Sequence, residues 1–140
     1  GVSYNKYLKE LGTTLGKALL AVHKSYFNSV YPAIQKYYSY IHGIAHLTGG
    51  GFYDNIKRVL RSDLDAKIKI NYDIPKIFKF FVKIGNVSLN EAFRVWNMGI
   101  GIILILDERE LDNLKIDYVV LGRIEKGNGK VCVDFSEVSI

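Results

Sequence analysis

The 140-residue sequence contains one cysteine, Cys132, and two prolines. A single cysteine excludes an internal disulfide and a cysteine-rich zinc site. The longest apolar run, from Met98 to Leu106, has about half the length that a membrane-spanning helix needs. The first residues lack the basic and then apolar order of a signal peptide. We therefore expect a cytoplasmic protein that does not interact with membranes.

The composition predicts one domain that covers residues 1–140. Apolar residues make up 49% and charged residues 24% of the chain, which are typical of globular proteins and exclude a disordered chain or a coiled coil. The net charge of +5 is compatible with an anionic ligand. The lysines and arginines are scattered rather than clustered, so nucleic-acid binding is not favoured.

Hydrophobic spacing and turn residues predict a mixture of helices and strands. The predicted helices cover residues 3–11, 15–38 with an interruption before Pro32 or near His23, 52–60, 75–85, 89–96 and 107–114. The predicted strands cover residues 41–48, 66–70, 99–106, 118–125 and 131–135. This mixture indicates the α+β class, with helices packed on a mixed sheet.

Four of the predicted strands have patterns that place them in the sheet. Lys67 and Lys69 alternate with apolar residues, which predicts one solvent-exposed face for residues 66–70. The nearly continuous β-branched run at 99–106 predicts a central strand buried on both faces. The last two strands are separated by a glycine-containing segment of five residues, 126–130, which predicts a hairpin.

The first candidate site surrounds three consecutive glycines between a predicted strand and a predicted helix. Glycine permits positive φ angles and lets a ligand approach backbone N–H groups, and the start of a helix favours a phosphate. A tight connection without a ligand fits the spacing as well, because the segment matches neither a Walker nor a dinucleotide-binding motif. The candidate ligand-binding residues here are His46, Thr48, Gly49, Gly50, Gly51, Asn55 and Arg58.

The second candidate segment joins the helix at 89–96 to the predicted central strand. Arg94 can offer two parallel hydrogen bonds to a phosphate or carboxylate, and Asn97 lies near the end of the same helix. Gly99 and Gly101 mark positions where another part of the chain or a ligand comes close. The spacing leaves both a binding role and a solvent-exposed role open for Arg94 and Asn97. Glu91 is expected to cap its helix.

No residues point to a metal site or to a reactive thiol. His42 and His46 alternate on one face of a predicted strand, but no third ligand accompanies them. Cys132 has no histidine in its own segment, which favours a buried, inert thiol over a nucleophile.

The two glycine-containing segments resemble the C-terminal half of the phosphoribosylformylglycinamidine cyclo-ligase family, also called aminoimidazole ribonucleotide synthetases. The resemblance rests on residues 46–60 and 85–101, with shorter matches at 15–20 and 120–124. It implies a layered α/β/α arrangement around a mixed sheet of four to five strands. The chain departs from the family pattern at residues 22–25, where Val-His-Lys-Ser replaces Pro-Thr-Arg-Ile, and it retains the tyrosine that follows.

The resemblance implies an activity for the protein of which this chain would be the second half. Family members use ATP to close the imidazole ring of formylglycinamidine ribonucleotide, which gives aminoimidazole ribonucleotide in purine synthesis. ATP and Mg²⁺ are expected to bind mainly to an N-terminal half that is absent from this chain, in a homodimeric enzyme. We expect His46 to take part in catalysis and the other candidate residues to bind the substrate or its phosphate. The chain alone is expected to be folded and inactive.

Two other interpretations stay open. The first is a sister enzyme, since enzymes that resemble selenophosphate synthetase or formylglycinamidine synthetase share the same two-half architecture. The second is a non-catalytic binding domain. The combination of Thr-Gly-Gly-Gly with Asn-Met-Gly-Ile-Gly resembles the cyclo-ligase more closely than these sister enzymes.

Overall fold

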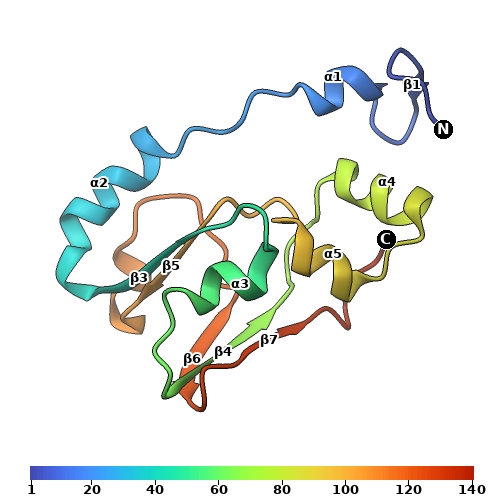
Figure 1. Cartoon of the computed structure of the whole chain (residues 1–140). Helices are drawn as coiled ribbons and strands as arrows, with labels where there is room; N and C mark the ends of the chain where they lie inside the picture. The colour runs from blue at the N-terminus through green and yellow to red at the C-terminus, as the bar shows by residue number, and fades with distance from the viewer.

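The computed structural model describes all 140 residues (Figure 1). The α-helices are α1 (Leu15–Leu19), α2 (Phe27–Tyr37), α3 (Gly51–Lys57), α4 (Lys76–Gly85) and α5 (Leu89–Val95), with 3-10 helices at η1 (Tyr38–Tyr40) and η2 (Glu108–Asn113). The strands are β1 (Tyr7–Leu8), β2 (Thr13–Thr14), β3 (Ile41–His46), β4 (Leu64–Lys69), β5 (Ile102–Leu106), β6 (Gly122–Lys126) and β7 (Val131–Asp134). No helix has both the length and the apolar character needed to cross a membrane.

The strands form three separate sheets. The mixed sheet has the order β6-β4-β7, in which β4 is antiparallel to β6 and parallel to β7. The pairs β3–β5 and β1–β2 are both antiparallel. The α+β class and a mixed sheet are confirmed, but the strands predicted to share one sheet of four to five are divided between two sheets. Residue alternation shows which face of a strand is buried, and it carries no information on which strands pair.

Two helices begin and end where their local signals predict. Pro75 is the N-cap of α4, and Asn86 adopts a left-handed conformation directly after it. Ser88 caps α5, with its hydroxyl oxygen accepting a hydrogen bond from the Glu91 backbone N–H at 3.2 Å. These caps satisfy backbone groups that a helix end leaves without partners.

The helix predicted at residues 3–11 is wrong, because this segment forms the hairpin of β1 and β2. Gly12 turns the chain with a φ of 67°, and Leu8 pairs with Thr13. The hairpin buries Leu8 against Leu15 and Phe80 of α4. A helix of nine residues gains too little by itself to compete with this burial.

The helical stretch predicted at 15–38 is interrupted at residues 20–26, so the break near His23 is confirmed. The alternative break before Pro32 is wrong, because Pro32 lies inside α2. A proline inside a helix removes one backbone hydrogen bond. Buried contacts of Val30 and Tyr37 hold α2 in place, and the Tyr37 hydroxyl donates a hydrogen bond to the Asn113 carbonyl at 2.6 Å.

The hairpin predicted at the C-terminal end is also wrong, because β4 lies between β6 and β7. The loop that joins these two strands passes around the start of β4. The Asp65 carboxylate accepts hydrogen bonds from the backbone N–H groups of Asn128 and Lys130, both at 2.8 Å. These two bonds lower the pKa of Asp65 below its usual value. The contact between Asp65 and this loop joins residues far apart in the sequence, and strand spacing cannot reveal it.

The strand predicted to be central at 99–106 is shorter and lies at an edge. It begins at Ile102, pairs only with β3, and all of its residues are half-buried. The apolar run therefore gives the correct secondary structure but the wrong burial. The helix predicted at 107–114 is present as the 3-10 helix η2.

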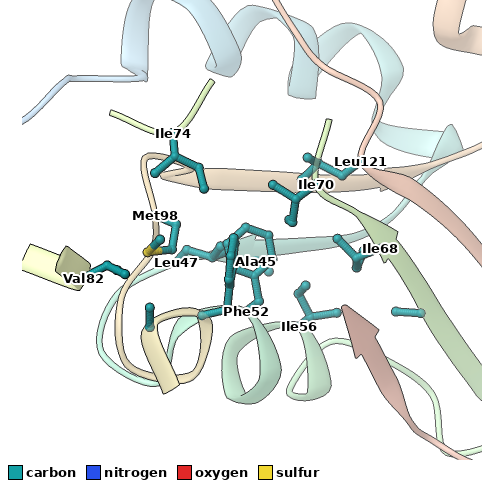
Figure 2. Close-up of a cluster of buried hydrophobic side chains, with 13 residues drawn as sticks. Ala45, Leu47, Phe52, Ile56, Ile68, Ile70, Ile74, Val82, Met98 and Leu121 are labelled. Atoms are coloured by element: carbon teal, nitrogen blue, oxygen red, sulfur yellow. The ribbon is translucent and has the colours of Figure 1, made fainter. Parts of the chain in front are cut away.

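One main core joins β3, β4 and helices α3, α4 and α5 (Figure 2). Phe52 of α3 and Phe93 of α5 are fully buried and meet edge to face, with 5.2 Å between ring centroids. The opposite face of β4 is solvent-exposed, as predicted, since Lys67 and Lys69 form ion pairs there with Glu125 and Glu137. Cys132 of β7 pairs with Lys67 and is exposed, so the predicted burial of its thiol is wrong. The core fixes the positions of the loops at the ends of β3 and α5.

Candidate functional site

The two glycine-containing segments lie side by side at one edge of the molecule. One is loop 47–51, which joins β3 to α3 and ends at Gly51, the first residue of α3, and the other is loop 96–101, between α5 and β5 (Figure 1). His46 at the end of β3 pairs with Ile102 at the start of β5. The Leu47 backbone N–H donates a hydrogen bond to the Gly101 carbonyl at 2.8 Å. The structure therefore brings together two motifs that are about 50 residues apart in the sequence.

The three glycines of loop 47–51 have different environments. Gly50 and Gly51 have left-handed φ angles of 93° and 53°, which confirms the predicted need for positive φ. A Cβ on Gly51 would overlap the carbonyl oxygen of Phe93, so this glycine lets α3 approach α5 closely. A Cβ on Gly49 would meet no atom within 4 Å. Gly49 is therefore the open position of the loop.

The buried side chain of Asn55, in α3, holds loop 47–51 in position. Its side chain is buried, and its amide nitrogen donates to the carbonyls of Gly51 at 2.8 Å, Gly49 at 3.3 Å and Thr48 at 3.5 Å. Its amide oxygen accepts from the Arg58 guanidinium at 3.2 Å. The Asn55 amide thus binds the loop itself, whereas Arg58 is exposed at the end of α3.

His46 and Thr48 are both exposed, while Leu47 between them is buried. This alternation places the two side chains on one side of the chain, as the spacing predicts. Strand β3 ends at His46, so Thr48 belongs to the loop. The imidazole and the hydroxyl are both open to a ligand at this edge.

Arg94 lies in the last turn of α5 with its side chain exposed. Its guanidinium stands 5.0 Å from the centre of the Tyr53 ring of α3, a cation–π contact. The Tyr53 hydroxyl donates a hydrogen bond to the Asn90 side-chain oxygen at 3.1 Å. Burial raises the pKa of Tyr53, and the positive charge of Arg94 partly offsets this effect. Stacking on Tyr53 limits the freedom of Arg94 without neutralising its charge.

Asn97 shapes loop 96–101. Its side-chain oxygen accepts a hydrogen bond from the Gly99 backbone N–H at 3.1 Å. Met98 has a left-handed φ of 50° and is fully buried, and its carbonyl accepts a hydrogen bond from the Tyr72 hydroxyl at 3.1 Å. A Cβ on Gly99 would lie 2.5 Å from Pro75. The close approach predicted at this glycine is therefore to the chain itself.

Two residues near this edge were not among the predicted site residues. A Cβ on Gly101 would overlap the hydroxyl of Tyr26, and it would lie 2.6 Å from ring atom Cε2. The ring of His23 meets the ring of His46 edge-on, with 6.4 Å between their centroids. Both residues belong to the segment between α1 and α2. One feature of the sequence could have pointed to this segment. Tyr26 is the tyrosine that the chain retains after residues 22–25, which depart from the family pattern.

The chain has no group of three or more histidine, cysteine, aspartate or glutamate side chains placed to hold a metal ion. A surface cavity of about 620 Å³ lies between α2 and residues 114–117, and another of about 370 Å³ lies near Asp73 and Glu137. The predicted site residues line neither cavity. They lie on an open edge instead.

The comparison with known proteins identifies the class to which this fold and this pair of loops belong. Residues 4–134 match the family model described as AIR synthase related protein, C-terminal domain. The chain belongs to this family.

Similar proteins include enzymes named phosphoribosylformylglycinamidine cyclo-ligase. That of Carboxydothermus hydrogenoformans is 40% identical over 135 residues, which cover 91% of this chain and 39% of the relative. That of Citrifermentans bemidjiense is 36% identical over 143 residues, covering 96% of this chain and 40% of the relative. The family resemblance inferred from the motifs is confirmed. The chain spans about 40% of the length of these curated relatives.

Proposed function

We propose that this chain forms the C-terminal half of a phosphoribosylformylglycinamidine cyclo-ligase. The reaction is the ATP-dependent ring closure of formylglycinamidine ribonucleotide to aminoimidazole ribonucleotide. The observation that carries the proposal is the hydrogen-bonded pair of loops 47–51 and 96–101, because these loops contain the motifs of the resemblance. Similarity to enzymes with this name at 36–40% identity supports it.

Loop 47–51 and Arg94 bind a phosphate group of the substrate in this proposal. The backbone N–H groups of Gly49 and Gly50 make no hydrogen bond within the chain, and backbone N–H groups of this kind bind phosphate well. The Thr48 hydroxyl can donate to the same group. Arg94 and Arg58 supply positive charge at this edge. The Asp54 carboxylate, which lies beside Gly50, supplies one negative charge there. Gly51, Asn55 and Asn97 keep the two loops in position.

His46 is the group proposed to move a proton. Ring closure requires the attacking nitrogen to lose a proton, and an exposed imidazole next to the substrate is suited to accept it. ATP supplies the phosphoryl group that turns the formyl oxygen into a good leaving group. We place ATP and Mg²⁺ in the part of the relatives that this chain does not cover, in a homodimeric cytoplasmic enzyme.

The test is turnover by the full-length protein, supplied with formylglycinamidine ribonucleotide, ATP and Mg²⁺. We expect aminoimidazole ribonucleotide and phosphate to form, with no product when ATP is omitted or when the 140-residue chain is used alone. A folded full-length protein that gives no product would contradict the proposed function.

A pair of histidine variants tests the role of His46. His42 and His46 are both exposed on β3, four residues apart. His46→Asn should lower kcat about 100-fold or more, as expected for loss of a general base. His42→Asn should leave kcat unchanged. Equal kcat values for the two variants would remove His46 from the mechanism.

A further inference from the structure

The segment of residues 20–26, here called the linker, joins α1 to α2 without secondary structure of its own (Figure 1). Six of its seven residues are exposed, and Tyr26 is half-buried. The linker meets loop 96–101 through Tyr26 at Gly101, and it meets the end of β3, directly before loop 47–51, through His23 at His46. It therefore forms a third side of the proposed site.

Tyr26 is held firmly at the start of α2. Its carbonyl accepts hydrogen bonds from the Val30 backbone N–H at 2.8 Å and from the Ser29 hydroxyl at 3.5 Å. The end of its ring fills the space that a side chain at residue 101 would occupy. Its hydroxyl makes no hydrogen bond within the chain, although it lies where loops 47–51 and 96–101 join. A hydroxyl placed in this way has a free donor for a bound molecule.

The surroundings of Tyr26 favour a negatively charged ligand. The Lys24 ammonium lies 5.5 Å from the centre of the Tyr26 ring, and Lys24 forms no ion pair. His23 donates from Nδ1 to the Lys24 carbonyl at 3.0 Å, because a carbonyl oxygen can only accept. Its Nε2 is thus left free at the same edge. An ammonium group without a carboxylate partner suits a phosphate.

We propose that Tyr26 is a phosphate-binding residue of this site, with its hydroxyl donating a hydrogen bond to a phosphate oxygen of a ligand held at the two glycine loops. The inference rests on the proposed function, in which both the ribonucleotide and ATP carry phosphate. It adds to the site a residue of the linker, which meets β3 at its C-terminal end, at His46.

The test uses the full-length protein with Tyr26→Phe, which removes the hydroxyl and keeps the ring over Gly101. Tyr38→Phe is the matched control, since Tyr38 is a 77% exposed tyrosine at the other end of α2. We expect Tyr26→Phe to raise the KM of one phosphate-bearing substrate about tenfold or more, the usual loss for a hydrogen bond to a charged group. The substrate whose KM rises, the ribonucleotide or ATP, identifies the source of the phosphate.

A second readout separates binding from folding. The urea midpoint of Tyr26→Phe should equal that of the wild type, because the hydroxyl has no partner in the folded chain. We also expect kcat to be unchanged, because the hydroxyl binds the phosphate and transfers no proton. Unchanged KM values for both substrates would overturn the inference while the proposed function stands.

Failure of the proposed function is recognised separately, as absence of turnover by the wild type. Tyr26 is then tested by calorimetry with ribose 5-phosphate and with inorganic phosphate on the same full-length proteins. Binding by the wild type that weakens about tenfold in Tyr26→Phe, but not in Tyr38→Phe, would support the inference. Equal binding by all three proteins, or no binding by the wild type, would overturn it.

Discussion

Loop 47–51 and loop 96–101 both carry glycines, but the glycines do different things. In loop 96–101, the space beside Gly99 is filled by Pro75 and the space beside Gly101 by Tyr26. In loop 47–51, a Cβ on Gly49 would meet nothing within 4 Å. Loop 96–101 is therefore a packing device that brings β5 and the linker together. Loop 47–51 keeps part of its backbone open to a ligand.

The difference also exists within loop 47–51. Gly51 is buried against the carbonyl of Phe93, two residues from the exposed Gly49. The buried end of the loop is fixed to α5, and the open end projects from the edge. Substitutions at these glycines should therefore separate stability from ligand binding.

The largest expected effect is at Gly51. Gly51→Ala adds a Cβ that overlaps the Phe93 carbonyl oxygen, at a left-handed φ of 53°. Overpacking and backbone strain together should lower the free energy of unfolding by about 3 kcal/mol. Urea unfolding monitored by circular dichroism measures it. The control Gly49→Ala should change stability by no more than about 1 kcal/mol, and equal losses for the two variants would refute the distinction within the loop.

The next largest effect is at Asn55. Asn55→Ala removes the buried amide that donates to the carbonyls of loop 47–51. We expect the free energy of unfolding to fall by about 2 kcal/mol. Asn113→Ala is the control, because Asn113 is exposed and its amide makes one hydrogen bond, to Glu110; its effect should stay within about 0.5 kcal/mol. A similar small change for Asn55→Ala would show that the loop does not depend on this amide.

Gly101→Ala should have a smaller effect than Gly51→Ala, because the obstacle is a side chain that can move. The new methyl group displaces the Tyr26 ring and should cost about 1 to 2 kcal/mol. The double variant Gly101→Ala/Tyr26→Ala tests the cause, since the two losses should not add when they arise from one contact. Strict additivity in urea unfolding would mean that Tyr26 and Gly101 do not interact.

The smallest expected effect is a change of stability with pH. It should distinguish loop 127–130, held by the Asp65 carboxylate, from loop 47–51, held by the neutral Asn55. Backbone hydrogen bonds from Lys130 and Asn128 lower the pKa of Asp65. The ionised Asp65 carboxylate therefore stabilises the folded protein fully above about pH 4, the usual pKa of an aspartate. This stabilisation is lost as the pH falls through the lower pKa that Asp65 has in the folded state. Only loop 127–130 should weaken in acid.

Urea midpoints at pH 6 and pH 3 measure this effect. Asp65→Asn should lower the midpoint at pH 6, and its difference from the wild type should shrink at pH 3. Asn55→Ala should differ from the wild type by the same amount at both pH values. A difference for Asp65→Asn that is independent of pH would show that the Asp65 charge does not hold the loop.

The same contrast explains what the sequence could predict. Helices α4 and α5 and the exposed face of β4 follow from local signals, such as Pro75 at a helix start and Ser88 as a cap. The N-terminal hairpin and the order β6-β4-β7 depend on contacts between distant residues, Leu8 with Phe80 and Asp65 with the loop after β6. Such contacts leave no periodic pattern in the chain.

The site shows the same division. Positive φ at the glycines of loop 47–51 is a local requirement, and it was predicted correctly. The burial of the Asn55 side chain against loop 47–51 could not be predicted from local signals. The position of a residue in a helix predicts which face it lies on, but not which group it contacts. The position of Tyr26 against Gly101 also depends on how the linker crosses the two loops. A glycine motif predicts a close approach to the backbone, but it does not show whether a ligand or another part of the chain makes that approach.

The most direct test of the central claim, that the open loop and Arg94 bind a phosphate group of the substrate, is the KM of the ribonucleotide for full-length Arg94→Ala. Arg123→Ala is the control, because Arg123 is 80% exposed and pairs with Glu125 within β6. Arg94→Ala should raise this KM about tenfold or more, and Arg123→Ala should leave it unchanged. A KM for Arg94→Ala equal to that of the wild type would contradict the claim.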